Sequence, residues 1–255
     1  MNRITCLLSA LVLFAGCGGN SSTSSSDKGS PSADDKPLFV VGAQALDAGS
    51  CIAKADPSAK LLAQGVLDLA FTSSYTALLL VGNQALQSGS ATETERVSLN
   101  GAEVSLTTAD GAVLGHYSTV GTGFIDAATA SAAYATLAVV VIPPAFALPP
   151  PTQNPQLLVA KIRVLGTALN GTELTSSELT LPIKVCTGCL VQYPPGAADP
   201  TQAAGAGYQC STSDSEPNAA PPPCVTGQDV PFSCVVCSAT YALCRDPTLN
   251  PSFSG

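Results

Sequence analysis

Apolar and polar side chains alternate with a period of two over much of the segment 38–186, and this feature constrains the fold most strongly. One run of alternate apolar residues is Leu158, Ala160, Ile162 and Val164, and another is Leu179, Leu181, Ile183 and Val185. Lys161 and Arg163 take the opposite parity within the first run. Because successive side chains of a strand point to opposite faces of a sheet, each run predicts a strand with one face on a core.

Three details give finer predictions about these strands. Pro182 lies within the second run, and because proline has no N–H to donate to a ladder, this strand is predicted at a sheet edge. Alternation from Leu67 to Phe71 predicts a strand with Asp68 facing outward. The stretch 127–141 fits either a helix or a strand, and we favour a strand because it ends in a run of valines.

Tight turns separate the predicted strands. Asn-Gly and Asp-Gly pairs, which supply the positive φ angles of two-residue hairpin turns, occur at Asn100-Gly101, Asp110-Gly111 and Asn170-Gly171. About seven or eight strands without a strong helix between them indicate a mainly β fold, an antiparallel immunoglobulin-like β-sandwich over residues 38–186. The chain contains no Trp, so the buried Trp typical of true immunoglobulin domains is missing.

The N-terminus has the form of an export signal. Arg3 is followed by a mostly apolar run, too short to span a bilayer, and by two small residues before Cys17. This segment resembles the lipobox signal peptide of bacterial lipoproteins. The resemblance implies a signal peptide at residues 1–16, anchoring to the membrane through acyl chains on Cys17 and, because Gly18 is not Asp, an outer-membrane location.

Composition divides the rest of the chain. Residues 17–37 are rich in Ser, Gly and Asp without apolar periodicity, which predicts a flexible tether after the lipidated cysteine. Residues 187–255 are rich in Pro, Gly and Cys, and we expect this tail to depend on disulfides because it has too little apolar material for its own core. The whole arrangement resembles uncharacterised envelope lipoproteins of Gram-negative bacteria with a cysteine-rich C-terminal region.

The cysteine count adds a constraint that is independent of the strands. If Cys6 leaves with the signal and Cys17 is acylated, the remaining cysteines are Cys51, Cys186, Cys189, Cys210, Cys224, Cys234, Cys237 and Cys244. Thiols oxidise outside the cytoplasm, so this even number predicts four disulfides whose pairing the sequence leaves open. All but one of these cysteines lie beyond residue 185, so complete pairing requires Cys51 to be joined to this distal group.

Two C-x-x-C motifs leave chemical alternatives open. They are Cys186-Thr187-Gly188-Cys189 and Cys234-Val235-Val236-Cys237, and their spacing serves zinc binding, thiol–disulfide exchange and haem attachment alike. Haem attachment needs His after the second cysteine, and zinc would need the two pairs to lie closer together in the sequence. A thioredoxin-like pair would lie at the N-terminus of a helix, and the residues after Cys186 have no helical pattern. We therefore expect structural disulfides with no metal and no cofactor, and redox exchange as the alternative.

Charge and side-chain types exclude several functions. Removal of Arg3 with the signal leaves nine Lys and Arg against eighteen Asp and Glu, without the basic cluster that nucleic acid binding requires. His116 is the only histidine, and neither a G-x-S-x-G nor an H-E-x-x-H motif occurs. We therefore expect a non-catalytic, membrane-anchored module that contacts an envelope protein or a surface ligand.

Overall fold

The computed structural model describes the chain from Lys36 onward with gaps. The described residues are 36–47, 49–87, 89, 93–146, 148, 155–193, 223–234, 242–245 and 249. The predicted signal peptide, Cys17 and nearly all of the tether lie outside them, as do Cys210 and Cys237.

The described residues form a mainly β fold, as the alternation predicts. A three-stranded sheet has the order β1-β3-β6, and a six-stranded sheet has the order β2-β9-β7-β4-β5 with β8 paired to β7. The bounds are β1 Leu38–Ala43, β2 Gly65–Asp68, β3 Tyr75–Asn83, β4 Val97–Thr108, β5 Val113–Ile125, β6 Ala133–Ile142, β7 Gln156–Ala168, β8 Glu173–Thr175 and β9 Leu179–Cys186. The strand β6 confirms the preference for a strand in the ambiguous stretch.

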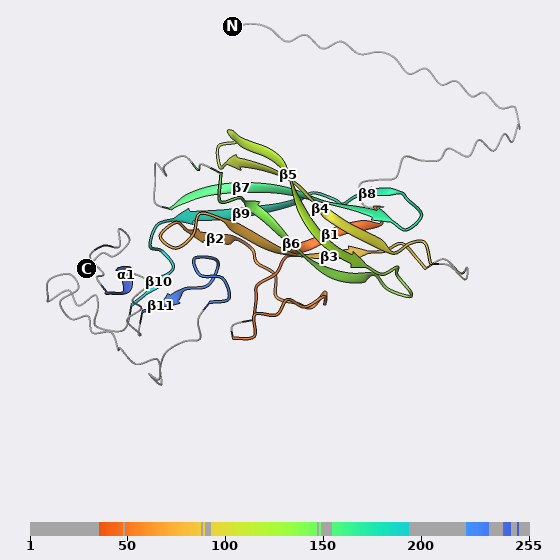
Figure 1. The fold of residues 1–255 in the computed structure, drawn as a ribbon, viewed down its shortest axis with the longest axis horizontal. Helices are drawn as coiled ribbons and strands as arrows, with labels where there is room; N and C mark the ends of the chain where they lie inside the picture. The colour runs from red at the N-terminus through yellow and green to blue at the C-terminus, as the bar shows by residue number, and fades with distance from the viewer. Residues whose placement is uncertain are drawn as a thin grey trace, which may run out of the picture.

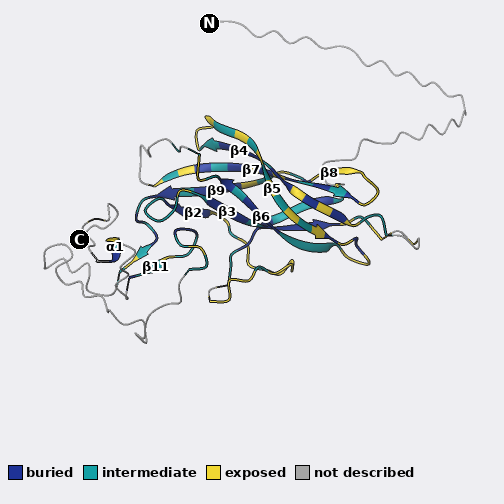
Figure 2. Ribbon diagram, viewed as in Figure 1, coloured by how far each residue is buried: buried dark blue, intermediate teal, exposed yellow. Residues whose placement is uncertain are grey.

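The two sheets, whose strands are labelled in Figure 1, share one apolar core. Leu79 and Val139 enter it from the smaller sheet, and Val104 and Ile162 enter it from the larger sheet. Burial alternates along β7 and β9 as predicted, and the exposed residues interrupt the buried ones along the strands in Figure 2.

The strand β9 is not an edge strand, so the prediction from its proline is wrong. It lies between β7 and β2 in the larger sheet. The pairing of β2 with β9 is parallel and begins at Ile183, so Pro182 lies just outside that ladder and its missing N–H disrupts nothing there. Because of this parallel pair, the larger sheet is mixed and not purely antiparallel.

Two of the three predicted turns lie between paired strands, but only their glycines and not Asp110 or Asn170 have a positive φ, so the two-residue primed type is not confirmed. Gly111 and Gly171 have φ angles of 90° and 86° and follow β4 and β7. Asn100-Gly101 instead lies inside β4, where the register shifts between Leu99 and Gly101 against both neighbouring strands. Gly101 has a φ of 134°, and the same backbone freedom that suits a turn here forms a β-bulge.

The strand predicted around Leu67 is shorter than expected and its polar residue is buried. β2 ends at Asp68, and the N–H groups of Phe71 and Thr72 then donate to the Asp68 carbonyl in a turn. The side chain of Asp68 is buried, so the prediction that it faces outward is wrong. It is buried because it accepts backbone hydrogen bonds from a neighbouring loop.

The described parts of the tail lie at one end of the two sheets (Figure 1). They include β10 (Val191–Gln192), which pairs in parallel with β11 (Phe232–Ser233), and the short helix α1 (Ala242–Arg245). No helix among the described residues is long and apolar enough to cross a membrane. The tail also contacts β2 directly, since the Asp68 N–H donates to the Gly227 carbonyl at 2.9 Å.

Candidate functional site

Parallel strands bring a carboxylate beside the first C-x-x-C motif. Asp68 is the last residue of β2 and Cys186 is the last residue of β9, and the two are register partners. Both strands run in the same direction, so their C-terminal residues lie side by side at one end of the strands. Cys186 forms a disulfide with Cys189, in the loop that follows.

The Asp68 carboxylate organises the loop that carries this disulfide. It accepts hydrogen bonds from the N–H groups of Gly188 at 2.7 Å and Leu190 at 2.8 Å, on its two oxygens. The Ala70 N–H donates to it as well, at 3.0 Å. Three donors satisfy a buried carboxylate, and together they fix the loop against the end of β2.

Among the described residues, the cysteines of the first C-x-x-C motif are the ones that lie beside a buried carboxylate. The ligand atoms of Asp68, Cys186 and Cys189 lie within 4.8 Å of one another, as a metal site would require, but the two sulfurs are bonded to each other and a sulfur in a disulfide is not a thiolate ligand. Cys186 is buried and Cys189 is half-buried, so an external thiol would reach Cys189 first.

Two further disulfides join the described cysteines. Cys51 is bonded to Cys224, which is 173 residues away, and this is the kind of bridge that the cysteine count requires of Cys51. Cys234 is bonded to Cys244. Cys234 of the second C-x-x-C motif is therefore bonded outside the motif, and not to the second cysteine of that motif.

His116 does not belong to either of these arrangements. It lies on β5, a strand at the edge of the larger sheet, and its side chain is exposed to solvent. Its register partner is Ser105 of β4, a strand that does not contribute to the cysteine corner.

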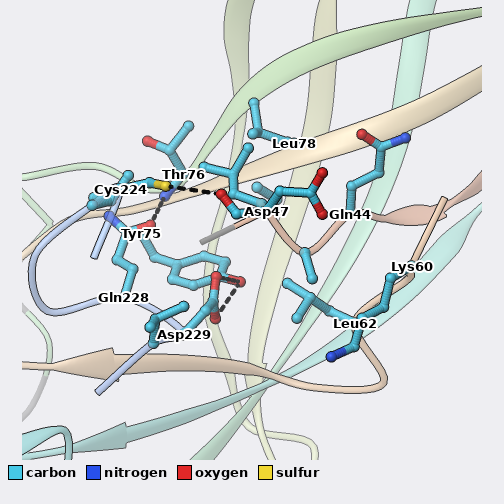
Figure 3. Close-up of a pocket in the computed structure, with 15 residues that line it drawn as sticks. Gln44, Asp47, Lys60, Leu62, Tyr75, Thr76, Leu78, Cys224, Gln228 and Asp229 are labelled. Atoms are coloured by element: carbon cyan, nitrogen blue, oxygen red, sulfur yellow. Dashed lines mark hydrogen bonds between the residues drawn. The ribbon is translucent and has the colours of Figure 1, made fainter. Parts of the chain in front are cut away.

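A cavity of about 400 Å³ lies where the tail meets the end of the sheets (Figure 3). Its walls come from β3, from the connection between β1 and β2 that contains Lys60, and from the tail residues between Cys224 and Val230. Gln228 fastens the tail here, because its side chain accepts from the Thr76 N–H and donates to the Ser74 carbonyl, both at 3.1 Å. Residues of the smaller sheet, of the connection after β1 and of the tail thus line one cavity.

A tyrosine and an aspartate face each other at the base of this cavity (Figure 3). The Tyr75 hydroxyl lies 3.1 Å from each carboxylate oxygen of Asp229, and the Val66 N–H donates to one of those oxygens at 2.8 Å. Burial raises the pKa of Asp229, and the hydrogen bonds from Val66 and Tyr75 oppose that shift. Burial, aided by the Asp229 carboxylate, raises the pKa of Tyr75 well above its ordinary value, so its hydroxyl remains a donor.

No motif in the sequence indicates this cavity. Tyr75 and Asp229 are 154 residues apart, and neither belongs to a recognisable pattern. The one related signal is the requirement that Cys51 pair with a distal cysteine, because it implies that part of the tail returns to the start of the sheets.

Comparisons with known proteins add no identity. No family model matches the chain, and no curated protein matches it. One solved structure that matches is described as "X-ray structure of Northeast Structural Genomics Consortium target SoR45". The two chains are 14% identical, the match covers 51% of this chain and 88% of that one, and the TM-score is 0.25. A likeness at this score bears on neither fold nor function.

Proposed function

We propose that the protein is a non-catalytic binding module of a bacterial cell envelope, anchored in the outer membrane through acyl chains on Cys17. The Cys51–Cys224 disulfide is the observation that carries this proposal. Disulfides persist in oxidising compartments and are rare in the cytosol, so a bridge that closes the described domain supports export. Export is also what the lipobox-like signal provides.

The proposal includes an immunoglobulin-like sandwich as the binding scaffold. In chain order, β1, β3 and β6 correspond to strands A, B and E, and β4, β5, β7 and β9 correspond to C, C′, F and G. The pairings A-B-E and C′-C-F-G of that fold are the pairings found here. Sandwiches of this type present loops at their ends for contact with partners, and function varies with those loops.

The anchor can be tested by mass spectrometry of the full chain expressed in a Gram-negative bacterium. We expect a membrane-bound protein whose first residue is Cys17 and whose N-terminal peptide carries the mass of two or three acyl chains. Cys17→Ala should abolish the acyl mass and release the protein from the membrane fraction, whereas Cys6→Ala, in the segment that is removed, should change neither. An unmodified Cys17 in the native protein would overturn the proposal.

Thiol–disulfide exchange at Cys186 and Cys189 is a second candidate, and the Asp68 carboxylate beside both sulfurs is the observation that favours it. A buried carboxylate near an exchanging pair can accept the proton of the attacking thiol. Treatment of the native protein with mild reductant, followed by alkylation and peptide mapping, separates the two functions. An exchanging pair should label at Cys189 well before Cys51 or Cys224, whereas a structural framework should leave all three unlabelled.

A further inference from the structure

The cavity of Figure 3 contains a carboxyl group, that of Asp229, whose acidity the fold itself does not require. Asp229 accepts hydrogen bonds from the Tyr75 hydroxyl and the Val66 N–H, and an uncharged amide oxygen could accept both. No salt bridge among the described residues includes Asp229. A partly buried carboxylate with these two donors and no cation beside it leaves a place for a positively charged partner.

The rest of the cavity has the character of a ligand site. Its volume of about 400 Å³ lies within the range of small-molecule sites, about 300 to 1,000 Å³. Leu62, Ala77, Leu78 and Val230 give it apolar walls. The other charged residues that line it lie on its exposed part, where Asp47 pairs with Lys54 at 3.0 Å and Lys60 is open to solvent.

We propose that this cavity binds an organic cation, in which an ammonium group contacts the Asp229 carboxylate and an apolar body packs against the walls. An ammonium group would supply the positive charge that no described residue provides to Asp229 in a salt bridge, and it would donate charge-assisted hydrogen bonds to the carboxylate. The Tyr75 hydroxyl and the Val66 N–H hold the carboxylate in place from the protein side. This site goes beyond the proposed anchoring and does not depend on Cys17.

Three probes that share a 2-phenylethyl group and differ in their polar group test the proposal on the full-length protein with its disulfides intact. They are 2-phenylethylammonium, 2-phenylethanol and 3-phenylpropanoate, and binding is measured by calorimetry together with NMR shifts of the cavity residues. We expect the ammonium to bind with a dissociation constant of about 1 mM, roughly tenfold tighter than the alcohol. The carboxylate probe should not bind detectably, because it would face the Asp229 carboxylate.

Asp229→Asn is the variant that removes the charge with the least change of shape. Asp229 has a φ of 58°, and Asn tolerates this left-handed conformation as well as Asp does. We expect this variant to lose about tenfold in affinity for the ammonium and to keep its affinity for the alcohol. Asp47→Asn, which removes the other carboxylate that lines the cavity, is the matched control and should change the ammonium affinity less than about twofold.

A second measurement applies even if Asp229→Asn does not fold. In the unaltered protein, affinity for the ammonium should fall as the pH is lowered through the raised pKa of Asp229, because the protonated carboxyl has no charge to offer. The titratable side chains that line the cavity are Asp47, Lys60, Tyr75 and Asp229. Equal affinity for the ammonium and the alcohol, an equal loss in the Asp47 variant, or no binding of any probe would overturn the proposal.

Discussion

The hydroxyl of Tyr75 connects the core of the sheets to the tail. Tyr75 is completely buried, and a Cβ atom added at Gly65 would lie only 2.3 Å from its oxygen, so Gly65 leaves the space in which the phenol sits. The hydroxyl then reaches Asp229 in the tail. One side chain therefore links β3 with a segment that is far away in the sequence.

Replacement of this tyrosine tests how much the link contributes. Tyr75→Phe should lower the free energy of unfolding by about 1.5 to 3 kcal/mol at neutral pH, since a partly buried carboxylate loses a donor. Tyr117→Phe removes a hydroxyl that donates to the neutral carbonyl of Val141, so it should lose only about 1 kcal/mol. Urea unfolding with intact disulfides measures both, and equal losses would show that the charge of Asp229 adds nothing to the bond.

The charge of Asp229 should also appear in the pH dependence of stability. Burial raises its pKa in the folded state, so its contribution to stability is fully present below the unfolded value near 3.8 and is lost as the pH rises through the folded value. The Asp229→Asn variant has no carboxyl group here, so its stability does not fall for this reason as the pH rises. We therefore expect the variant to be more stable relative to the original protein at pH 7 than at pH 4, as measured by chemical unfolding; a difference that stays constant or reverses would contradict the shift.

At the level of single elements, the bulge in β4 depends on one glycine. A Cβ atom at Gly101 would lie 2.0 Å from the carbonyl oxygen of Thr119 on β5, whereas one at Gly111 in the hairpin turn would meet nothing within 4 Å. Both glycines have φ angles in the region that other residues rarely adopt. Gly111 is therefore a control for the backbone conformation alone.

These two positions give a paired prediction. Gly111→Ala should cost about 1 to 2 kcal/mol, the usual penalty for a left-handed residue. Gly101→Ala should cost at least about 2 kcal/mol more, because β5 must also move away from β4. Thermal or urea unfolding of both variants measures the difference, and similar losses would mean that β5 can shift without consequence.

The elements also show why some of the fold was predictable and some was not. Alternation identified β7 and β9 because burial on one face leaves a period of two in the sequence. The Asn-Gly pair at Gly101 was misassigned because turns and bulges need the same positive φ, and only the partner strands distinguish them. The burial of Asp68 has no sequence signal, because two of its three donors, the N–H groups of Gly188 and Leu190, come from a loop about 120 residues away.

At the scale of the whole molecule, the Cys51–Cys224 disulfide closes nearly the entire described domain. Cys51→Ser should expose Cys224 to alkylation in the native protein, whereas the double variant Cys51→Ser/Cys224→Ser should show no new thiol. In the chain-entropy model the loss of a bridge across 173 residues lowers stability by about 5 kcal/mol. Peptide mapping after native alkylation checks the first expectation and urea unfolding the second; labelling at a different cysteine would contradict this pairing.

The tail residues that complete the cavity are also the last part of it to be synthesised. A growing chain contains every strand from β1 to β9 by Cys186, yet Gln228 and Asp229 are still absent. Until they arrive, the Tyr75 hydroxyl has no carboxylate to meet and the end of β3 is uncovered. The cavity therefore cannot form until the chain has been synthesised through Asp229. Any ligand of the complete cavity would bind only chains that include these tail residues.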